Sequence, residues 1–405
     1  MIIKIGQLKY NLTDIFMCIF VSILLAFRDY SKSIIFLSLV MLVWLVINKI
    51  KKWQIKKDIA AFCIYKLMFI GLSFVSSFWS VNPDVTHLCL SMMYRLIICL
   101  CVLLYVDSEQ NFIKMIKFCI IGAILLCIRM IIVVPMSAWG NSRVGSYLSH
   151  DPDNSYGNTG ITYVLGVVSA MLIANKTIIK NNKWRYLLII GFILFSFMSG
   201  SKKQFFIILI AYFVFLLLQS NNYWVFLKNV CLYSLLVFGV FIVLNRVPVL
   251  YNTIGYRIES LFSFFGKNTA NLDDLSTVSR ISFLKQAFDV FLEHPFIGVG
   301  IDSFKYYNSY QFTWAECNVL ELLADLGVIG FAIYYLPHIK IANRLFKLTR
   351  GKEKMVIMNI TMFVILLFID LTMVSYNETH LQFFLSILFA YVIFPRIRNG
   401  VCNDE

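Results

Sequence analysis

The side chains best suited to chemistry in this sequence are six basic residues. The hydropathy pattern puts them at one depth, near the outer ends of apolar segments. They are Arg95, Arg129, Arg143, Lys202, Lys203 and Arg280. Opposite charges attract more strongly near lipid than in bulk water, so such a set favours a polyanionic ligand. Arginine suits phosphate in particular, because its planar fork can donate two hydrogen bonds at once. The pattern predicts a binding site for a phosphate or pyrophosphate group.

Three of these residues also have simpler interpretations. Lys202 and Lys203 occupy a short outer turn, SGSKKQ, where two solvated lysines cost little. Arg280 lies in the first turn of a predicted helix, where it could contact lipid headgroups instead of a substrate.

Acidic side chains supply a candidate general base. Glu316 lies just before an apolar segment, where a carboxylate could take the proton of a hydroxyl group without a metal. Glu321 and Asp325 are four residues apart, so they share one face of the following helix. Solvation at the membrane interface is the alternative for both. The residues predicted to line the pocket are Asp370, His294, Glu321 and His380.

Metal and nucleotide chemistry have little support. The five histidines form no HxH or HxxxH pair. Glu293 with His294, or Asp151 with Asp153, could bind a cation, and both pairs are minor alternatives. The sequence has no P-loop and no GxGxxG pattern. We therefore expect no cofactor and no metal. The ten cysteines are scattered without a pairing pattern, so we interpret them as small apolar residues.

Membrane-spanning helices must position these side chains. The chain has 405 residues, of which 60% are hydrophobic and 14% charged, whereas soluble proteins carry about 25% charged residues. A helix that crosses a bilayer needs about 20 mostly apolar residues. The candidate segments are 11–27, 33–48, 59–79, 88–106, 115–134, 159–175, 185–199, 203–219, 224–244, 319–338, 355–374 and 378–395. We predict an all-α polytopic membrane protein with about 12 transmembrane helices.

One large polar interruption divides these segments. Residues 1–244 hold spans 1–9, residues 245–318 form the interruption and residues 319–405 hold spans 10–12, and we expect one integrated membrane domain. Within the interruption, residues 279–293 predict an amphipathic helix that lies along the interface and ends at Pro295.

The distribution of charge predicts an orientation. Lysine and arginine are more frequent in the loops on the N-terminal side, and this bias puts both termini in the cytoplasm and the large loop outside. The net charge of +14 follows this topology, so we expect no nucleic acid. Inside the spans, Lys66 lies near an inner end and could extend to the cytoplasm, and Arg129 and Asp370 could pair with each other.

Four segments resemble a known family. RVGSYLSHDPDN, SGSKK, HPFIGVG and ECNVLELLADLGVIG look like the bacterial O-antigen ligase and polymerase superfamily, which includes the Wzy-type capsule and O-antigen polymerases. The position of the large loop and the number of spans are similar too. HPFIGVG together with the downstream LELLADLGVIG is the more specific part.

The resemblance implies a glycosyltransferase of the bacterial inner membrane that uses sugars linked to undecaprenyl pyrophosphate at the outer face. It implies that Arg143 and Asn154 match an Arg…Asn loop and that Arg280 matches the arginine of the large loop. Lys202 or Lys203 falls where the family often has an arginine. Chain-length regulators and flippases are the implied partners, besides the lipid-linked oligosaccharide and the bilayer.

One departure favours a polymerase over a ligase. Ligases of this family usually have His-Asn where this chain has Glu316 and Cys317. We expect a sugar hydroxyl to attack the anomeric carbon of a second lipid-linked chain, with Glu316 as base and the basic residues on the leaving pyrophosphate. A lipid-linked oligosaccharide flippase is the competing class. No internal repeat typical of transporters is visible, and the charges lie in the outer half of the spans.

Overall fold

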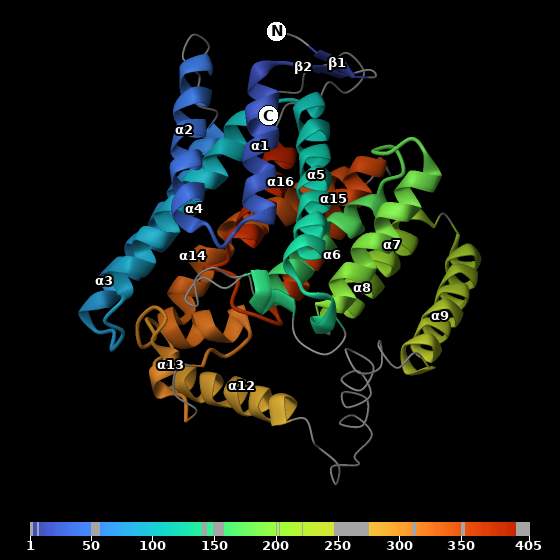
Figure 1. Cartoon of the computed structure of the whole chain (residues 1–405). Helices are drawn as coiled ribbons and strands as arrows, with labels where there is room; N and C mark the ends of the chain where they lie inside the picture. The colour runs from blue at the N-terminus through green and yellow to red at the C-terminus, as the bar shows by residue number, and fades with distance from the viewer. Residues whose placement is uncertain are drawn as a thin grey trace. The chain divides into compact units, whose positions relative to one another are not determined.

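Helices dominate the computed structural model (Figure 1). It describes residues 3–5, 8–49, 57–139, 144–148, 158–199, 201, 203–220, 222–246, 275–309, 313–349 and 353–393. Each of the twelve segments predicted to span the membrane contains a helix: α1 Leu12–Ala26, α2 Ser31–Lys49, α3 Lys57–Val75, α4 Val85–Tyr105, α5 Glu109–Val133, α6 Asn158–Ala174, α7 Asn182–Met198, α8 Lys203–Gln219, α9 Tyr223–Arg246, α14 Asn318–Leu348, α15 Lys354–Asp370 and α16 Thr379–Ile393. The helical nature of these segments is confirmed.

Length and composition identify the protein as a membrane protein. Within the part of the chain that the structure describes, five helical stretches are long and apolar enough to cross a bilayer: Ser31–Asn48, Lys57–Phe78, Val85–Tyr105, Glu109–Val133 and Asn318–Leu348. Four shorter helical stretches among the described residues are also apolar: Leu12–Ala26, Gly160–Ala174, Phe206–Gln219 and Thr379–Ile393. The total of about 12 spans stays a prediction, as does the orientation.

Short elements fill the connections. An antiparallel hairpin of β1 (Ile3–Ile5) and β2 (Leu8–Tyr10), with Ile3 opposite Tyr10, precedes α1. Asn11 then starts α1 through a capping box, in which its side chain accepts from the Asp14 N–H and the Asp14 carboxylate accepts from the Asn11 N–H. Single 3-10 turns cover η2 (Ser76–Phe78), η3 (Met136–Ala138) and η4 (Val144–Leu148).

The described helices form two compact units. The first comprises Met1–Leu37, Ile113–Asp274 and Leu345–Ile365. In this unit α6 packs against both α7 and α8, and Tyr163 of α6 is fully buried. A buried ion pair between Lys114 and Asp14, 2.7 Å apart, joins α5 to α1. Two charges buried together stabilise each other, whereas either one alone would be costly.

The second unit contains most of the predicted site. It comprises Ser38–Phe112, Leu275–Arg344 and Leu366–Glu405. Here α4 packs against α3 and α16. The large loop contributes α12 (Leu275–Glu293) and the four-residue α13 (Phe304–Tyr307), which contact each other (Figure 1).

The helix predicted for residues 279–293 is present as α12, which begins four residues earlier, and its place along the membrane interface stays a prediction. Its buried stripe is Phe283, Ala287 and Val290, and the last two pack against Val299 and Phe304 of the loop. Two other apolar residues of the helix, Ile281 and Phe288, are exposed. α12 thus carries two apolar faces, one towards the loop and one outward.

Candidate functional site

The two glycine-containing segments that stood out in the sequence pack on each other. α14 is kinked at Gly327, which has a φ of 61°, and the GVG turn lies against this kink. The Val299 N–H donates to the Ala324 carbonyl at 3.0 Å and the Gly300 N–H to the Asp325 carbonyl at 2.7 Å. These bonds give partners to carbonyls that an unbroken helix would have used itself. The two motifs therefore form one structural unit.

Glycine is required on both sides of this contact. Gly298 has a φ of 63°, and a Cβ added there would lie 2.3 Å from the carbonyl of Asp325. A Cβ on Gly327 would lie 2.3 Å from the carbonyl of Phe296. Backbone meets backbone in both cases, so no side-chain rotation can relieve the clash.

Replacing Gly298 with alanine should therefore destabilise the protein by at least about 2 kcal/mol, because a left-handed backbone strain of about 1–3 kcal/mol adds to the clash. Thermal unfolding in detergent measures this. Gly71→Ala in α3 is the matched control, since its added Cβ would meet nothing within 4 Å. Equal unfolding temperatures for the two variants would contradict the packing described above.

Asp325 organises the loop that follows the glycine turn. Its fully buried carboxylate accepts three backbone N–H groups, from Asp302 at 2.7 Å, Ser303 at 3.0 Å and Phe304 at 2.9 Å. The interfacial solvation that we considered for Asp325 does not occur, because no part of the residue is exposed. Asp325 fixes the start of α13 and is best described as an anchor of the loop.

Glu321, one turn earlier on α14, also binds the backbone of the loop. It is fully buried, and its Oε2 accepts the Ala315 N–H at 2.6 Å. The Glu321 N–H in turn donates to the Cys317 carbonyl at 2.9 Å. These bonds hold the segment on either side of Glu316. Cys317 itself is buried, and burial raises the pKa of its thiol above its ordinary value, so it behaves as an apolar residue.

The two residues predicted to carry catalysis meet in space. Arg280 Nε lies 2.7 Å from Glu316 Oε2, although the residues are far apart in the sequence, and the side chains are 42% and 41% exposed. Glu316 also has a φ of 54°, which is unusual for a residue other than glycine. Non-glycine residues in this conformation cost about 1–3 kcal/mol and cluster at functional sites. An accessible, backbone-fixed carboxylate beside a guanidinium is chemically suited to acid–base catalysis and to anion binding.

A polar network that sequence reasoning missed lies beside this loop. Asp302, with a φ of 55°, accepts from Lys305 Nζ at 2.5 Å, from Trp314 Nε1 at 2.6 Å and from Asn82 Nδ2 at 3.1 Å. Asp302 and Lys305 follow the GVG turn directly, which was a usable signal. Asn82 belongs to a short turn before α4, and nothing in the sequence linked it to the loop.

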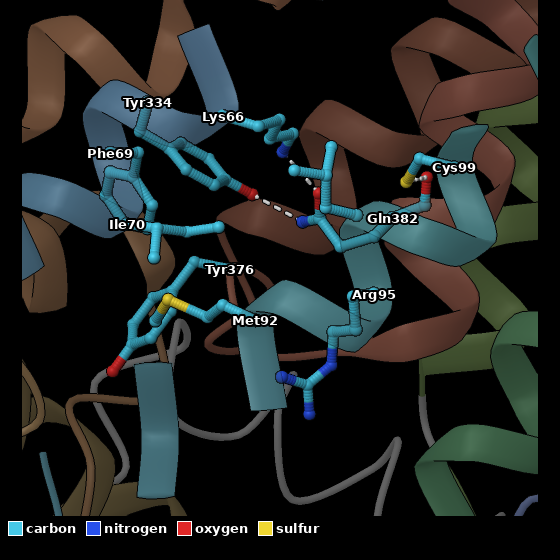
Figure 2. A pocket seen from close by; sticks show the side chains of 10 residues that line it. Lys66, Phe69, Ile70, Met92, Arg95, Cys99, Tyr334, Tyr376 and Gln382 are labelled. Carbon is cyan, nitrogen blue, oxygen red and sulfur yellow. Dashed lines mark hydrogen bonds between the residues drawn. The ribbon is translucent and has the colours of Figure 1, made fainter. Parts of the chain in front are cut away.

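Arg95 lies deeper in the same unit, at the edge of a small cavity. The cavity measures about 20 Å³, which is room for about one water molecule. Figure 2 shows Lys66, Phe69, Arg95, Tyr334, Tyr376 and Gln382 around it. Arg95 is buried, and it donates to Thr379 Oγ1 at 3.2 Å and to Asn377 Oδ1.

The interpretation of Lys66 needs correction. We expected its ammonium group to extend towards the cytoplasm. Instead it donates to Gln382 Oε1, and the Gln382 amide donates to the Tyr334 hydroxyl at 3.1 Å (Figure 2). The Tyr334 ring also lies under the ammonium group, with its centroid 5.2 Å away. The contacts of the ammonium group with Gln382 and with the face of the Tyr334 ring replace solvation by water at the cytoplasmic end of the helix.

The other pocket candidates of this unit are dispersed. His380 is buried, with its Nδ1 3.6 Å from Glu378 Oε1. Asp370 is also buried and accepts from the Tyr335 hydroxyl at 3.0 Å. His294, by contrast, is exposed just after the end of α12. None of these contacts joins the three residues to the Arg280–Glu316 pair.

Two basic candidates belong to the other unit. Arg129 binds Asp29 through two hydrogen bonds of 2.7 and 2.8 Å, and it also donates to the carbonyls of Ala26 and Leu148. We expected Arg129 to pair with Asp370, but its acidic partner is Asp29. Because most of its N–H groups donate to groups of the protein, we interpret Arg129 as a structural residue. Lys203, at the start of α8, donates to the Tyr163 hydroxyl at 3.1 Å.

Three predicted site residues, Arg143, Asn154 and Lys202, lie outside the described residues. Their proposed role in binding pyrophosphate stays a prediction.

Part of the chain is similar to a known protein family. A family model described as O-antigen ligase matches residues 186–335. The matched region runs from α7 into α14, so it includes Arg280, Glu316 and the packed glycine segments. No curated protein and no solved structure matches the chain.

Proposed function

We propose that this chain is a member of the O-antigen polymerase and ligase superfamily, whose family model matches residues 186–335, and that within it the protein is a polysaccharide polymerase. It joins oligosaccharide repeat units carried on undecaprenyl pyrophosphate, at the outer face of the bacterial plasma membrane. The protein is thus a membrane glycosyltransferase whose donor is a sugar linked to a lipid pyrophosphate.

The ion pair of Arg280 and Glu316 carries this proposal. Both side chains are about 40% exposed, so a substrate can reach them. The pair uses the Nε edge of the guanidinium, and arginine has further N–H donors on its two Nη atoms. Those donors suit the oxygens of a pyrophosphate.

The proposed reaction is a direct displacement. The hydroxyl oxygen of an acceptor sugar forms a bond to the anomeric carbon of the donor chain. The bond between that carbon and the pyrophosphate oxygen breaks, and undecaprenyl pyrophosphate leaves with the electron pair. Glu316 accepts the hydroxyl proton, and Arg280 stabilises the negative charge that develops on the leaving oxygen.

A ligase is the second candidate, because the matching family model is described as O-antigen ligase. In a ligase the acceptor would be a different glycan, not another lipid-linked chain of the same kind. The presence of Glu316 and Cys317, where the family's ligases usually have His-Asn, supports the polymerase.

Deleting the gene should remove long surface polysaccharide and leave single lipid-linked repeat units. A size separation of the polysaccharide, together with a probe for the lipid-linked intermediate, measures this. Long chains that accumulate on undecaprenyl pyrophosphate would instead identify a ligase. Repeat units retained on the cytoplasmic side would identify a flippase and would overturn the proposal.

A further inference from the structure

Trp314 is held in a fixed position, although much of it faces outward. The residue is 46% exposed, yet its indole Nε1 donates to Asp302 Oδ1 at 2.6 Å. Asp302 is only 9% exposed, and the Lys305 ammonium group, which binds its other oxygen, lies 5.8 Å from the centroid of the indole ring. One edge of the ring is therefore tethered to a buried charged network, while almost half of the residue's surface is accessible.

The tether makes the ring a rigid surface. The N–H group of a buried indole edge needs a hydrogen-bond acceptor. Here the acceptor is a carboxylate, and hydrogen bonds to charged groups are stronger than neutral ones. The indole plane is thus set before any ligand arrives, which lowers the entropy lost on binding.

Its place in the chain sets Trp314 next to the proposed chemistry. Trp314 precedes Glu316 by two residues, so their Cα atoms are at most about 7 Å apart. The backbone here is fixed, because the N–H of the intervening Ala315 donates to Glu321 and the carbonyl of the preceding Thr313 accepts from Asn308 Nδ2 at 3.3 Å. A flat group lying on the indole would therefore lie next to the chain segment that carries Glu316.

We propose that Trp314 is the platform on which the acceptor sugar ring rests while Glu316 takes its hydroxyl proton. One face of a pyranose ring is made of C–H groups, which can pack on an aromatic surface, whereas its hydroxyl groups point outward around the rim. Asp302 contacts the indole and not the sugar, so it is a positioning residue. This inference rests on the proposed function and adds the acceptor site to it.

The steady-state kinetics of variants test the platform. The assay uses the full chain in nanodiscs, with lipid-linked repeat units extracted from a strain that lacks the gene. Trp314→Ala and Trp314→Leu should raise KM about 3- to 10-fold, as the loss of an aromatic contact implies, and should change kcat less than about twofold. Trp314→Phe keeps an aromatic face and should stay within about twofold of wild type in KM.

Trp224→Ala is the matched control. Trp224 lies on α9, is 77% exposed and contacts Tyr223 edge-on, so its removal should leave KM unchanged. Thermal unfolding of each variant confirms that it folds. If Trp314→Ala is too unstable, Trp314→Leu against Trp314→Phe decides the question with less loss of volume.

Two results would overturn the platform. Wild-type KM in Trp314→Ala and Trp314→Leu would mean that the ring only contacts lipid headgroups, as exposed tryptophans of membrane proteins often do. Equal loss in the leucine and phenylalanine variants, or a fall in kcat alone, would mean that Trp314 only supports the loop. Deleting the gene separates these results from a failure of the function: long surface polysaccharide in the deletion strain would remove the proposed polymerase activity, and the platform with it.

Discussion

Replacing Arg280 with alanine should lower the rate of polymer formation by about 100- to 1,000-fold, the usual cost of removing a group that stabilises charge in a transition state. The physical reason is the leaving pyrophosphate, whose negative charge grows as its bond to the sugar breaks. The variant also leaves Glu316 without the guanidinium that lies 2.7 Å away. The size distribution of surface polysaccharide in a complemented deletion strain measures the effect, with the protein level checked in the same cells.

Two further variants make this result specific. Arg280→Lys keeps the charge but loses the planar fork, and it should recover only part of the activity. Lys285→Ala removes a positive charge from an exposed position five residues further along α12, and it should give wild-type chain lengths. Wild-type chain lengths in Arg280→Ala would instead mean that this arginine has no part in the reaction.

The helices of this protein were largely predictable, because membrane helices depend on local composition. Each of the twelve apolar segments that the sequence indicated is helical, and α12 was recognised by its periodicity. The kink of α14 was not predicted. It depends on Gly327 meeting the backbone of Phe296, which is a contact between distant segments that no local pattern contains.

The candidate site was predictable in its residue types but not in its partners. Arg280 and Glu316 were each singled out by charge and position, and their contact could not be inferred across the long segment between them. Arg129 and Lys66 show the opposite outcome. Their charges near lipid suggested ligand binding or solvation, but both found partners inside the protein, in Asp29 and Gln382. A buried cation needs some partner, and the sequence cannot say whether that partner is a substrate or the protein itself.

The glycine segments and the proposed catalytic pair are physically linked. Asp325 and Glu321 lie one helical turn apart on α14 and hold different parts of the loop. Asp325 binds the backbone after the GVG turn, and Glu321 binds the Ala315 N–H next to Glu316. The start of α14 thus acts as a template that sets the position of Glu316 from two sides. This link explains why a motif without catalytic side chains of its own belongs to the site.

Replacing Glu316 with glutamine should reduce kcat by about 100- to 10,000-fold, which is the typical contribution of a general base. Glutamine has the same shape and can still accept a hydrogen bond from Arg280, but it cannot take a proton from the acceptor hydroxyl. Glu316→Asp should recover only part of the rate, because the shorter side chain places the carboxylate farther from the acceptor hydroxyl. Residues that act in one step are not additive, so the double variant Arg280→Ala, Glu316→Gln should be little worse than the poorer single variant. Full activity in Glu316→Gln would show that positioning and leaving-group stabilisation suffice, and the base would have to be withdrawn from the mechanism while Arg280 kept its role.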